Sequence, residues 1–209
     1  MTDSTHLSQP LSEHPVLILS GGRSQRMGQD KAQLMVGGKT MLQRVDDAMA
    51  RLSEQRILVI GHDATPPTNC GFETVIRDQY PDRGPLEGLR VGLEYLSDSP
   101  IVFVGTCDAP SVIADVYHAM VAELGPEDDA VVPRVQGQVY PLTAVYRTRV
   151  IGQVQSMVQE HRLRVKDLLE LIKVRWFPEQ HLRAVDPDGE SLKNVNTQQE
   201  YLNLIKRQE

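Results

Sequence analysis

Two glycines and three cations lie close together near the beginning of the chain. Gly21 and Gly22 leave backbone N–H groups accessible, and Arg23, Arg26 and Lys31 follow shortly after them. Several N–H groups and cations at one point are what a polyphosphate needs. A lone Gly-Gly pair is more simply interpreted as a surface turn, but the complete string favours a phosphate-binding loop.

A single aspartate, Asp108, is the second candidate for chemistry. It follows an apolar segment, residues 101–107, and precedes Ala109 and Pro110. A carboxylate at the end of a buried strand costs solvation free energy unless a cation or hydrogen-bond donors meet it. Magnesium held by triphosphate oxygens would meet it, because this ion usually takes only one or two protein carboxylates. The alternative is that Asp108 caps a helix that begins near Pro110.

A third polar cluster includes Asp78, which ends another apolar segment, and the turn Gly84-Pro85 soon after it. Glycine followed by proline suits a tight turn at the start of a helix, whose N–H groups would face a ligand. We expect an anion or a base edge to bind there. Taken alone, the turn is better explained as an ordinary helix start.

These polar groups need strands that end at one edge of a sheet. Short apolar segments predict buried strands, at residues 16–19, 57–61, 73–78 and 101–107. A helix capped by Thr40 and a helix through Leu89 and Leu96 lie between them. This alternation predicts an α/β fold with a Rossmann-like doubly wound, mostly parallel mixed sheet and helices on both faces. The ligand of such a sheet lies at the carboxyl ends of the strands, where the three clusters converge.

The second half of the chain is less regular. Further strands are predicted at residues 130–133 and 174–177, and helices at residues 111–124, 149–158, 164–172 and 197–206, the last capped by Thr197. Residues 139–146 predict a strand that returns after a hairpin at Gly137. Pro141 within it indicates that the strand is at an edge or is interrupted.

Three residues of this half are candidates for binding a second substrate. Asn194 and Asn196 precede the closing helix, where asparagines usually satisfy the local backbone and alternatively hydrogen-bond a polar substrate. Arg164 lies in a run of alternating basic and apolar residues. Such a run is more typical of a solvated face than of a site for a phosphate-bearing acceptor.

Composition and motif spacing exclude several functions. The 209 residues carry a net charge of −6, which argues against general nucleic-acid binding. No apolar run approaches the roughly 20 residues that span a bilayer, so we expect a cytoplasmic protein with no membrane partner. Gln33 stands where a P-loop ending in Gly38-Lys39-Thr40 needs glycine. The two cysteines and six histidines lack the spacing of a scaffold or a zinc site.

The domain organisation follows from a change in composition near residue 15. Residues 1–15 are rich in Ser, Thr, Gln and Pro without periodicity, so we expect a disordered leader. Residues 16–209 are then one domain, with a nucleotide-binding half at about 16–110 and an acceptor-side half at about 111–209.

Together these motifs resemble those of the molybdenum cofactor guanylyltransferases, the MobA family of the nucleotidyltransferase superfamily. The resemblance covers about residues 16–205 and rests on motifs in the same order, which are Leu19-Ser20-Gly21-Gly22, Arg26-Met27-Gly28-Gln29-Asp30-Lys31, Asp78, Gly84-Pro85-Leu86-Glu87-Gly88, Cys107-Asp108-Ala109-Pro110, Tyr140-Pro141-Leu142 and Asn194-Val195-Asn196-Thr197. It implies a fold of the nucleotide-diphospho-sugar transferase type. It also implies transfer of GMP from GTP to the terminal phosphate of molybdopterin, with release of pyrophosphate and formation of the guanine dinucleotide cofactor.

The resemblance implies roles for individual residues as well. Arg26, Lys31 and Asp108 would be catalytic, with Asp108 as the ligand of Mg²⁺ or Mn²⁺. The nucleotide would contact Leu19, Ser20, Gly21, Gly22, Lys31, Asp78, Gly84 and Asp108, and the acceptor would contact Asn194, Asn196 and Arg164. GTP and molybdopterin are the implied substrates, and other proteins of molybdenum cofactor biosynthesis and molybdoenzyme chaperones are the implied partners.

Three positions bear on specificity. Gly21 points to GTP, because family members that use CTP tend to have alanine there. Ser20 replaces the usual alanine, and Ile60 stands where the family has an asparagine, which puts one nucleotide contact in doubt. The alternatives are a CTP-dependent molybdopterin cytidylyltransferase, a sugar-phosphate nucleotidyltransferase, and a GTP-binding regulator without chemistry.

Overall fold

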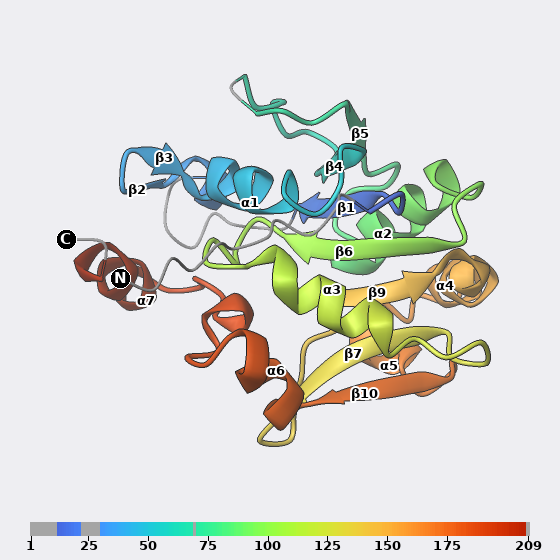
Figure 1. Cartoon of the computed structure of the whole chain (residues 1–209). Helices are drawn as coiled ribbons and strands as arrows, with labels where there is room; N and C mark the ends of the chain where they lie inside the picture. The colour runs from blue at the N-terminus through green and yellow to red at the C-terminus, as the bar shows by residue number, and fades with distance from the viewer. Residues whose placement is uncertain (1–11, 22–29, 69, 208–209) are drawn as a thin grey trace.

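The computed structural model describes residues 12–21, 30–68 and 70–207. In this part of the chain the main feature is an eight-stranded sheet with the order β10-β7-β9-β6-β1-β4-β5, in which β8 pairs with β7 (Figure 1). The strands are β1 Val16–Ser20, β4 Arg56–Ile60, β5 Thr74–Arg77, β6 Ile101–Thr106, β7 Ala130–Val135, β8 Gln138–Val139, β9 Ala144–Arg147 and β10 Val174–Pro178.

The sheet is mostly parallel, as the sequence predicts. Strand β1 pairs in parallel with β4 and β6, β4 with β5, and β7 with β10. Strand β9 is antiparallel to both of its neighbours, β6 and β7. The prediction of a mixed doubly wound sheet is therefore confirmed.

The strand predicted at residues 139–146 is interrupted, and the alternative of an edge position is wrong. Residues 138–139 form β8, and Pro141 lies in the break before β9, where no ladder N–H is needed. Strand β9 then enters the sheet between β6 and β7. Ala144, Val145 and Tyr146 are fully buried there, because both faces of this central strand are covered.

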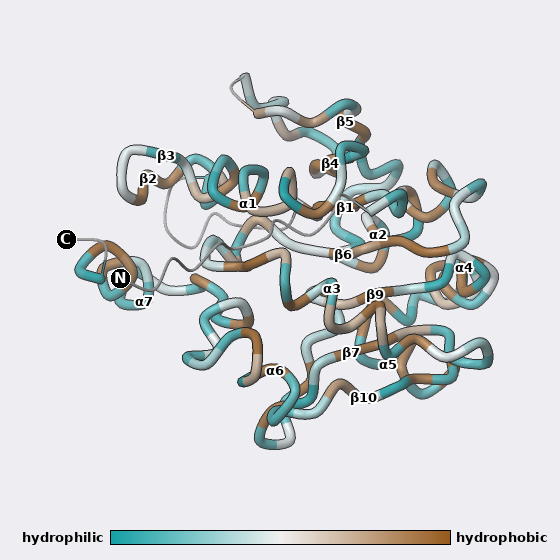
Figure 2. Tube along the Cα trace, in the orientation of Figure 1, coloured by the Kyte–Doolittle hydropathy of each residue, from teal (hydrophilic) through white to brown (hydrophobic). Residues whose placement is uncertain are grey.

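Helices cover both faces of the sheet. On one face, α1 Met41–Met49, α3 Ala114–Ala122 and α6 Glu179–Val185 pack against residues such as Ile18, Leu58 and Phe103. On the other face, α2 Gly84–Tyr95, α4 Ile151–Gln159 and α5 Val165–Leu168 pack against residues such as Leu17 and Val104. Hydrophobic residues accordingly gather along central strands such as β6 (Figure 2). Among the described residues, no helix is long and apolar enough to cross a membrane.

A third, smaller cluster attaches the C-terminal helix to the nucleotide-binding half. Helix α7 Gln198–Lys206 lies near the hairpin of β2 Met35–Val36 and β3 Lys39–Thr40 (Figure 1). Val195 and Leu204 pack with Leu34, Val36 and Met41. The Thr40 and Thr197 side chains form capping boxes at the starts of α1 and α7, as predicted. This packing brings residues near 196 next to the short 3-10 helix η2 Lys31–Gln33.

Some predicted boundaries differ from the structure. The helix predicted at 164–172 is confined to α5, and α6 and the 3-10 helices η3 Thr148–Val150 and η4 Glu190–Leu192 were not predicted. Helix α6 buries only Leu182, so it carries no apolar periodicity. The first eleven residues of the predicted leader lie outside the described residues. Ser12 N donates to Leu52 O at 2.7 Å, so the described chain is already attached before Val16.

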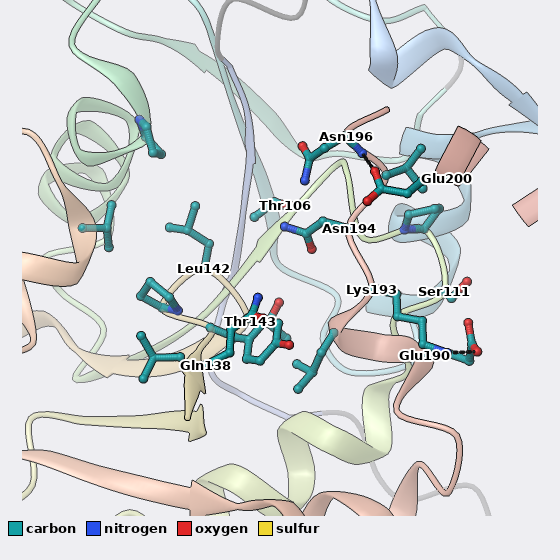
Figure 3. A pocket seen from close by; sticks show the side chains of 18 of the residues that line it. Thr106, Ser111, Gln138, Leu142, Thr143, Glu190, Lys193, Asn194, Asn196 and Glu200 are labelled. Carbon is teal, nitrogen blue, oxygen red and sulfur yellow. Dashed lines mark hydrogen bonds and ion pairs between the residues drawn. The ribbon is translucent and has the colours of Figure 1, made fainter. Parts of the chain in front are cut away.

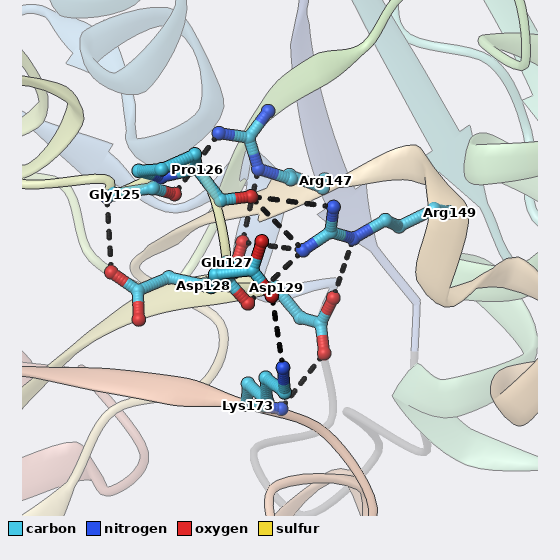
Figure 4. Close-up of polar contacts among 8 residues, drawn as sticks. All are labelled: Gly125, Pro126, Glu127, Asp128, Asp129, Arg147, Arg149 and Lys173. Carbon is cyan, nitrogen blue, oxygen red and sulfur yellow. Dashed lines mark hydrogen bonds and ion pairs between the residues drawn. The ribbon is translucent and has the colours of Figure 1, made fainter.

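A polar network ties three strands together at the end of the sheet opposite the predicted site (Figure 4). Asp129 accepts hydrogen bonds from Arg149 Nε at 2.7 Å and from Lys173 N at 2.8 Å. Arg147 Nε donates to Asp128 O at 2.9 Å. The residues involved precede β7 and β10 or lie at and just after the end of β9, so this network holds the acceptor-side strands in register.

Candidate active site

Asp108 lies just beyond the carboxyl end of β6. Its carboxylate accepts a hydrogen bond from Thr106 Oγ1, and its backbone N–H donates to the same hydroxyl oxygen at 3.3 Å. Burial raises the pKa of Asp108, although the Thr106 hydrogen bond and the charge of Lys31 oppose this shift. The half-buried carboxylate would therefore be stabilised by a further cation.

The surroundings of Asp108 fit a magnesium ion that is shared with a phosphate substrate. No group of three or more His, Cys, Asp or Glu side chains within the described segments could hold a metal ion by itself. A single carboxylate is unsuited to zinc, whereas Mg²⁺ uses one or two carboxylates together with substrate phosphates and water. Asp108 is thus a suitable ligand for the Mg²⁺ or Mn²⁺ of a nucleotide complex.

Lys31 and the glycine segment share the sheet edge with Asp108. Strands β1 and β6 are adjacent, Leu19 pairs with Thr106, and Cys107 N donates to Leu19 O at 3.1 Å. Leu19 is buried, and Ser20 and Gly21 continue from it toward the same edge. Gly22 and Arg26, which the sequence also places at the site, lie outside the described residues.

Lys31 is held at the start of η2. The Asp30 carboxylate caps this turn by accepting a hydrogen bond from Ala32 N at 3.0 Å. The Lys31 ammonium donates to Asn196 Oδ1 at 2.8 Å. Val195 N donates to Asp108 O at 2.8 Å. The segment with the two predicted acceptor asparagines is therefore joined to Lys31 and Asp108, the two candidate catalytic residues that the structure describes.

Asp78 follows β5 and faces the glycine segment. Its Oδ1 is buried and has no hydrogen-bond partner among the described residues. Its Oδ2 lies 3.5 Å from the position that a Cβ on Gly21 would occupy, and Oδ1 lies 3.4 Å from that of a Cβ on Gly88. Burial and the nearby Glu87 raise the pKa of Asp78 to about 6, against the lowering effects of Arg90 and His62.

The lack of a partner on Asp78 indicates a place for a ligand donor. An unpaired buried carboxylate oxygen is costly. Leu19 and Val59 pack beside Gly88 near Oδ1, whereas Gly21 leaves room for ordinary contact near Oδ2. Ile60, which stands where the family has an asparagine, is the last residue of β4. His62 comes two residues later, and its Nδ1 lies 3.1 Å from the backbone oxygen of Asp78. Gly84, which has a φ of +65°, starts α2 close by.

Sequence reasoning missed a buried ion pair beneath Asp78. Glu87 is fully buried and accepts hydrogen bonds from Arg90 Nε at 3.0 Å and Nη2 at 2.7 Å. Arg90 also donates to Glu94 at 2.7 Å and to Gln79 at 2.8 Å. The spacing of Glu87, Arg90 and Glu94 on one helix indicates ion pairs. The spacing does not show that the Glu87–Arg90 pair is buried.

A cavity of about 790 Å³ lies on the acceptor side of the site (Figure 3). Thr106 and Asn196, the hydrogen-bond partners of Asp108 and Lys31, are among its lining residues. Pro85, Thr106 and Asn196 line its border with the nucleotide-binding residues. The three residues predicted to bind the acceptor all line it. Lys166, from the same basic run as Arg164, and Tyr140, from a motif of the family resemblance, line it too, and so do polar residues that were not predicted, including Gln138, Thr143, Glu190, Lys193 and Arg207.

The cavity has cationic and apolar parts. Glu190 pairs with Lys193 at 2.5 Å and with Arg207 at 2.8 Å. The side chains of Arg164 and Lys166 have no hydrogen bond or ion pair within the described part of the chain. Leu142 and Leu163 contribute apolar surface. Such a lining suits a flat organic molecule that carries an anionic group.

Comparison with known proteins gives consistent matches. The model of the MobA-like NTP transferase domain matches residues 16–177. A molybdenum cofactor guanylyltransferase from Desulfosudis oleivorans is 32% identical over 88% of this chain and 90% of its own length.

Solved structures share the fold. Molybdopterin-guanine dinucleotide biosynthesis protein A from Archaeoglobus fulgidus superimposes with a TM-score of 0.76 at 21% identity, covering 92% of this chain and 97% of that protein. A Mycobacterium tuberculosis protein solved in complex with manganese has a TM-score of 0.62 at 19% identity, covering 93% of this chain and 99% of that one.

Proposed function

Because the chain belongs to the family of MobA-like NTP transferase domains, we propose that this nucleotidyltransferase moves GMP from GTP to the terminal phosphate of molybdopterin. The products are pyrophosphate and molybdopterin guanine dinucleotide. One observation carries the proposal. The Lys31–Asn196 contact joins the edge of the sheet that holds Asp78 and Asp108 to the acceptor-side cavity. The cationic and apolar side chains of that cavity suit the phosphate and the flat ring system of molybdopterin.

Guanine recognition is assigned to Asp78 and Gly21. An ionised carboxylate accepts two hydrogen bonds, and the N1–H and N2–H groups of guanine are adjacent donors. Asp78 Oδ1 lacks a partner among the described residues, and Gly21 leaves the space beside Oδ2 open. Cytosine offers one donor group at the corresponding edge, so this arrangement supports GTP over CTP.

Lys31 and Asp108 are assigned to the triphosphate, together with Arg26. A Mg²⁺ or Mn²⁺ ion bound by Asp108 would neutralise charge on the phosphate oxygens. Lys31 and Arg26 would contact the transferring and leaving phosphates, where negative charge accumulates. The attacking phosphate is already anionic at neutral pH, so the reaction needs positioning and charge neutralisation and no general base.

The cavity is assigned to molybdopterin. Asn194, Asn196 and Arg164 line it. We assign the approach of the acceptor phosphate to the Lys31–Asn196 contact, because this contact links the cavity to a residue assigned to the triphosphate. The cytoplasmic location and the partner proteins named above remain expectations from the family resemblance.

The test is pyrophosphate release by the purified protein with molybdopterin, Mg²⁺ and each of the four NTPs in turn. We expect turnover with GTP. Lys31→Ala and Asp108→Ala should each lower the rate by at least about 10²-fold while leaving the melting temperature near that of the wild type. Lys39→Ala and Asp47→Ala, which alter an exposed surface pair, serve as charge-matched controls and should retain activity.

Three results would contradict the proposal. Turnover with CTP in place of GTP would favour the cytidylyltransferase alternative. Turnover with a hexose phosphate and no turnover with molybdopterin would favour a sugar-phosphate enzyme. Tight GTP binding without pyrophosphate release would indicate a regulator.

A further inference from the structure

The contact between Lys31 and Asn196 joins residues that lie 165 positions apart in the chain. Asn196 is exposed, and its side chain lines the acceptor cavity. Its amide oxygen accepts a hydrogen bond from a residue that we assign to the nucleotide phosphates. This contact suggests a role for Asn196 that begins before any acceptor binds.

The backbone on both sides of the contact is held firmly. Asn196 N donates to Glu200 Oε2 at 2.7 Å, and the preceding Val195 is buried and donates to Asp108 O at 2.8 Å. On the other side, Lys31 O accepts a hydrogen bond from Leu34 N at 3.1 Å. The backbone that carries the Asn196 amide is therefore fixed close to the long lysine side chain (Figure 3 shows Asn196 and Glu200).

The charge of the Lys31 ammonium acts on two carboxylates, those of Asp108 and Glu200. The charge of Lys31 lowers the pKa of Asp108 against the larger effect of burial. It also contributes to the lowered pKa of Glu200, which is caused mainly by the hydrogen bond from Asn196 N. Nevertheless, Lys31 forms an ion pair with neither carboxylate within the described segments, and its hydrogen bond goes to the neutral amide.

We propose that Asn196 is a positioning residue that holds the Lys31 ammonium between the two substrates and away from Asp108. The inference rests on the proposed function. A neutral acceptor orients the cation without neutralising it, so its charge stays available to the triphosphate. The same arrangement leaves the Asp108 carboxylate free for a metal ion.

The test is GTP binding measured by calorimetry without any acceptor, with and without Mg²⁺. Asn196→Ala should weaken GTP binding by at least about tenfold, the lower end of the loss expected when a hydrogen bond to a charged group is removed. A residue that only binds the acceptor would leave the GTP affinity unchanged. Asn203→Ala is the matched control, because Asn203 is an exposed asparagine at the same cavity whose Oδ1 accepts a hydrogen bond from Gln199 at 3.0 Å. It should bind GTP within twofold of the wild type.

A double-mutant cycle with Lys31→Met identifies the residue through which Asn196 acts. Once the ammonium is absent, Asn196→Ala should cause no further loss of GTP affinity. Equal GTP affinities for Asn196→Ala and the wild type would overturn the inference, and so would additive losses in the cycle. If the wild-type protein binds no GTP, the proposed function fails and this inference fails with it. If the wild type binds GTP and releases pyrophosphate while Asn196→Ala binds GTP normally, only the inference fails.

Discussion

The substitution Gly21→Ala separates base recognition from folding. The added methyl carbon would lie 3.4 Å from Gly61 N, 3.5 Å from Asp78 Oδ2 and 3.7 Å from Gly61 Cα. These are ordinary contact distances, and Gly21 has no positive φ, so the folded protein accepts alanine without a shift. An alanine with a compatible backbone restricts the unfolded chain and stabilises a protein by about 0.4–1 kcal/mol.

The same methyl group should weaken GTP binding. It would occupy the space beside Asp78 Oδ2, where a guanine N–H must come within about 2.9 Å to donate a hydrogen bond. Loss of a hydrogen bond to a charged group costs about 1.5–3 kcal/mol, which corresponds to a rise of roughly 10- to 150-fold in the Kd for GTP.

Calorimetry with GTP and thermal unfolding of the same samples measure both effects. We expect a melting temperature that is unchanged or higher by about 1–4 °C, together with the weaker GTP binding. Gly61→Ala is the control, because its methyl group would approach only the Ala64 side chain, at 3.9 Å. A Kd for GTP within twofold of the wild type in Gly21→Ala would refute the placement of guanine between Gly21 and Asp78.

Two further predictions follow from the structure. The pKa of Asp78 is raised to about 6 by burial and Glu87, so the ionised form that accepts guanine N–H groups is lost below that pH. GTP affinity measured against pH should fall by up to about tenfold per unit below pH 6, and Asp78→Asn should abolish this dependence. Gly92→Ala would place a methyl group 2.4 Å from two carbons of the fully buried Leu17, and this overpacking should lower the free energy of unfolding by about 1–3 kcal/mol. Gly152→Ala, also within a helix but with nothing within 4 Å, should not destabilise the protein in the same denaturation assay.

The sequence alone determined the local features of this protein. Apolar runs predicted β1, β4 and β6, since buried parallel strands need continuous hydrophobic residues. Strand β5 was also predicted, but its predicted burial is wrong, because it lies at the edge of the sheet and its residues are half-buried or exposed. Thr40 and Thr197 predicted two helix starts, because capping depends on residues within one turn. The order of the strands then placed Gly21, Asp78 and Asp108 at one edge of the sheet. For the strands and the helix starts, the residues that decide the structure are close together in the chain, whereas the shared edge followed from the alternation of strands and helices.

Only the tertiary structure decided the features that depend on distant segments. The interior position of β9 follows from strand pairing and could not be deduced from Pro141. The burial of Glu87 and Arg90 depends on how α2 packs on the sheet, which the charged spacing does not reveal. The contact of Lys31 with Asn196 exists because Val195 and Leu204 pack beside Leu34 and Met41. Packing between segments more than a hundred residues apart minimises exposed apolar surface over the whole molecule, and no local pattern in the sequence records its outcome.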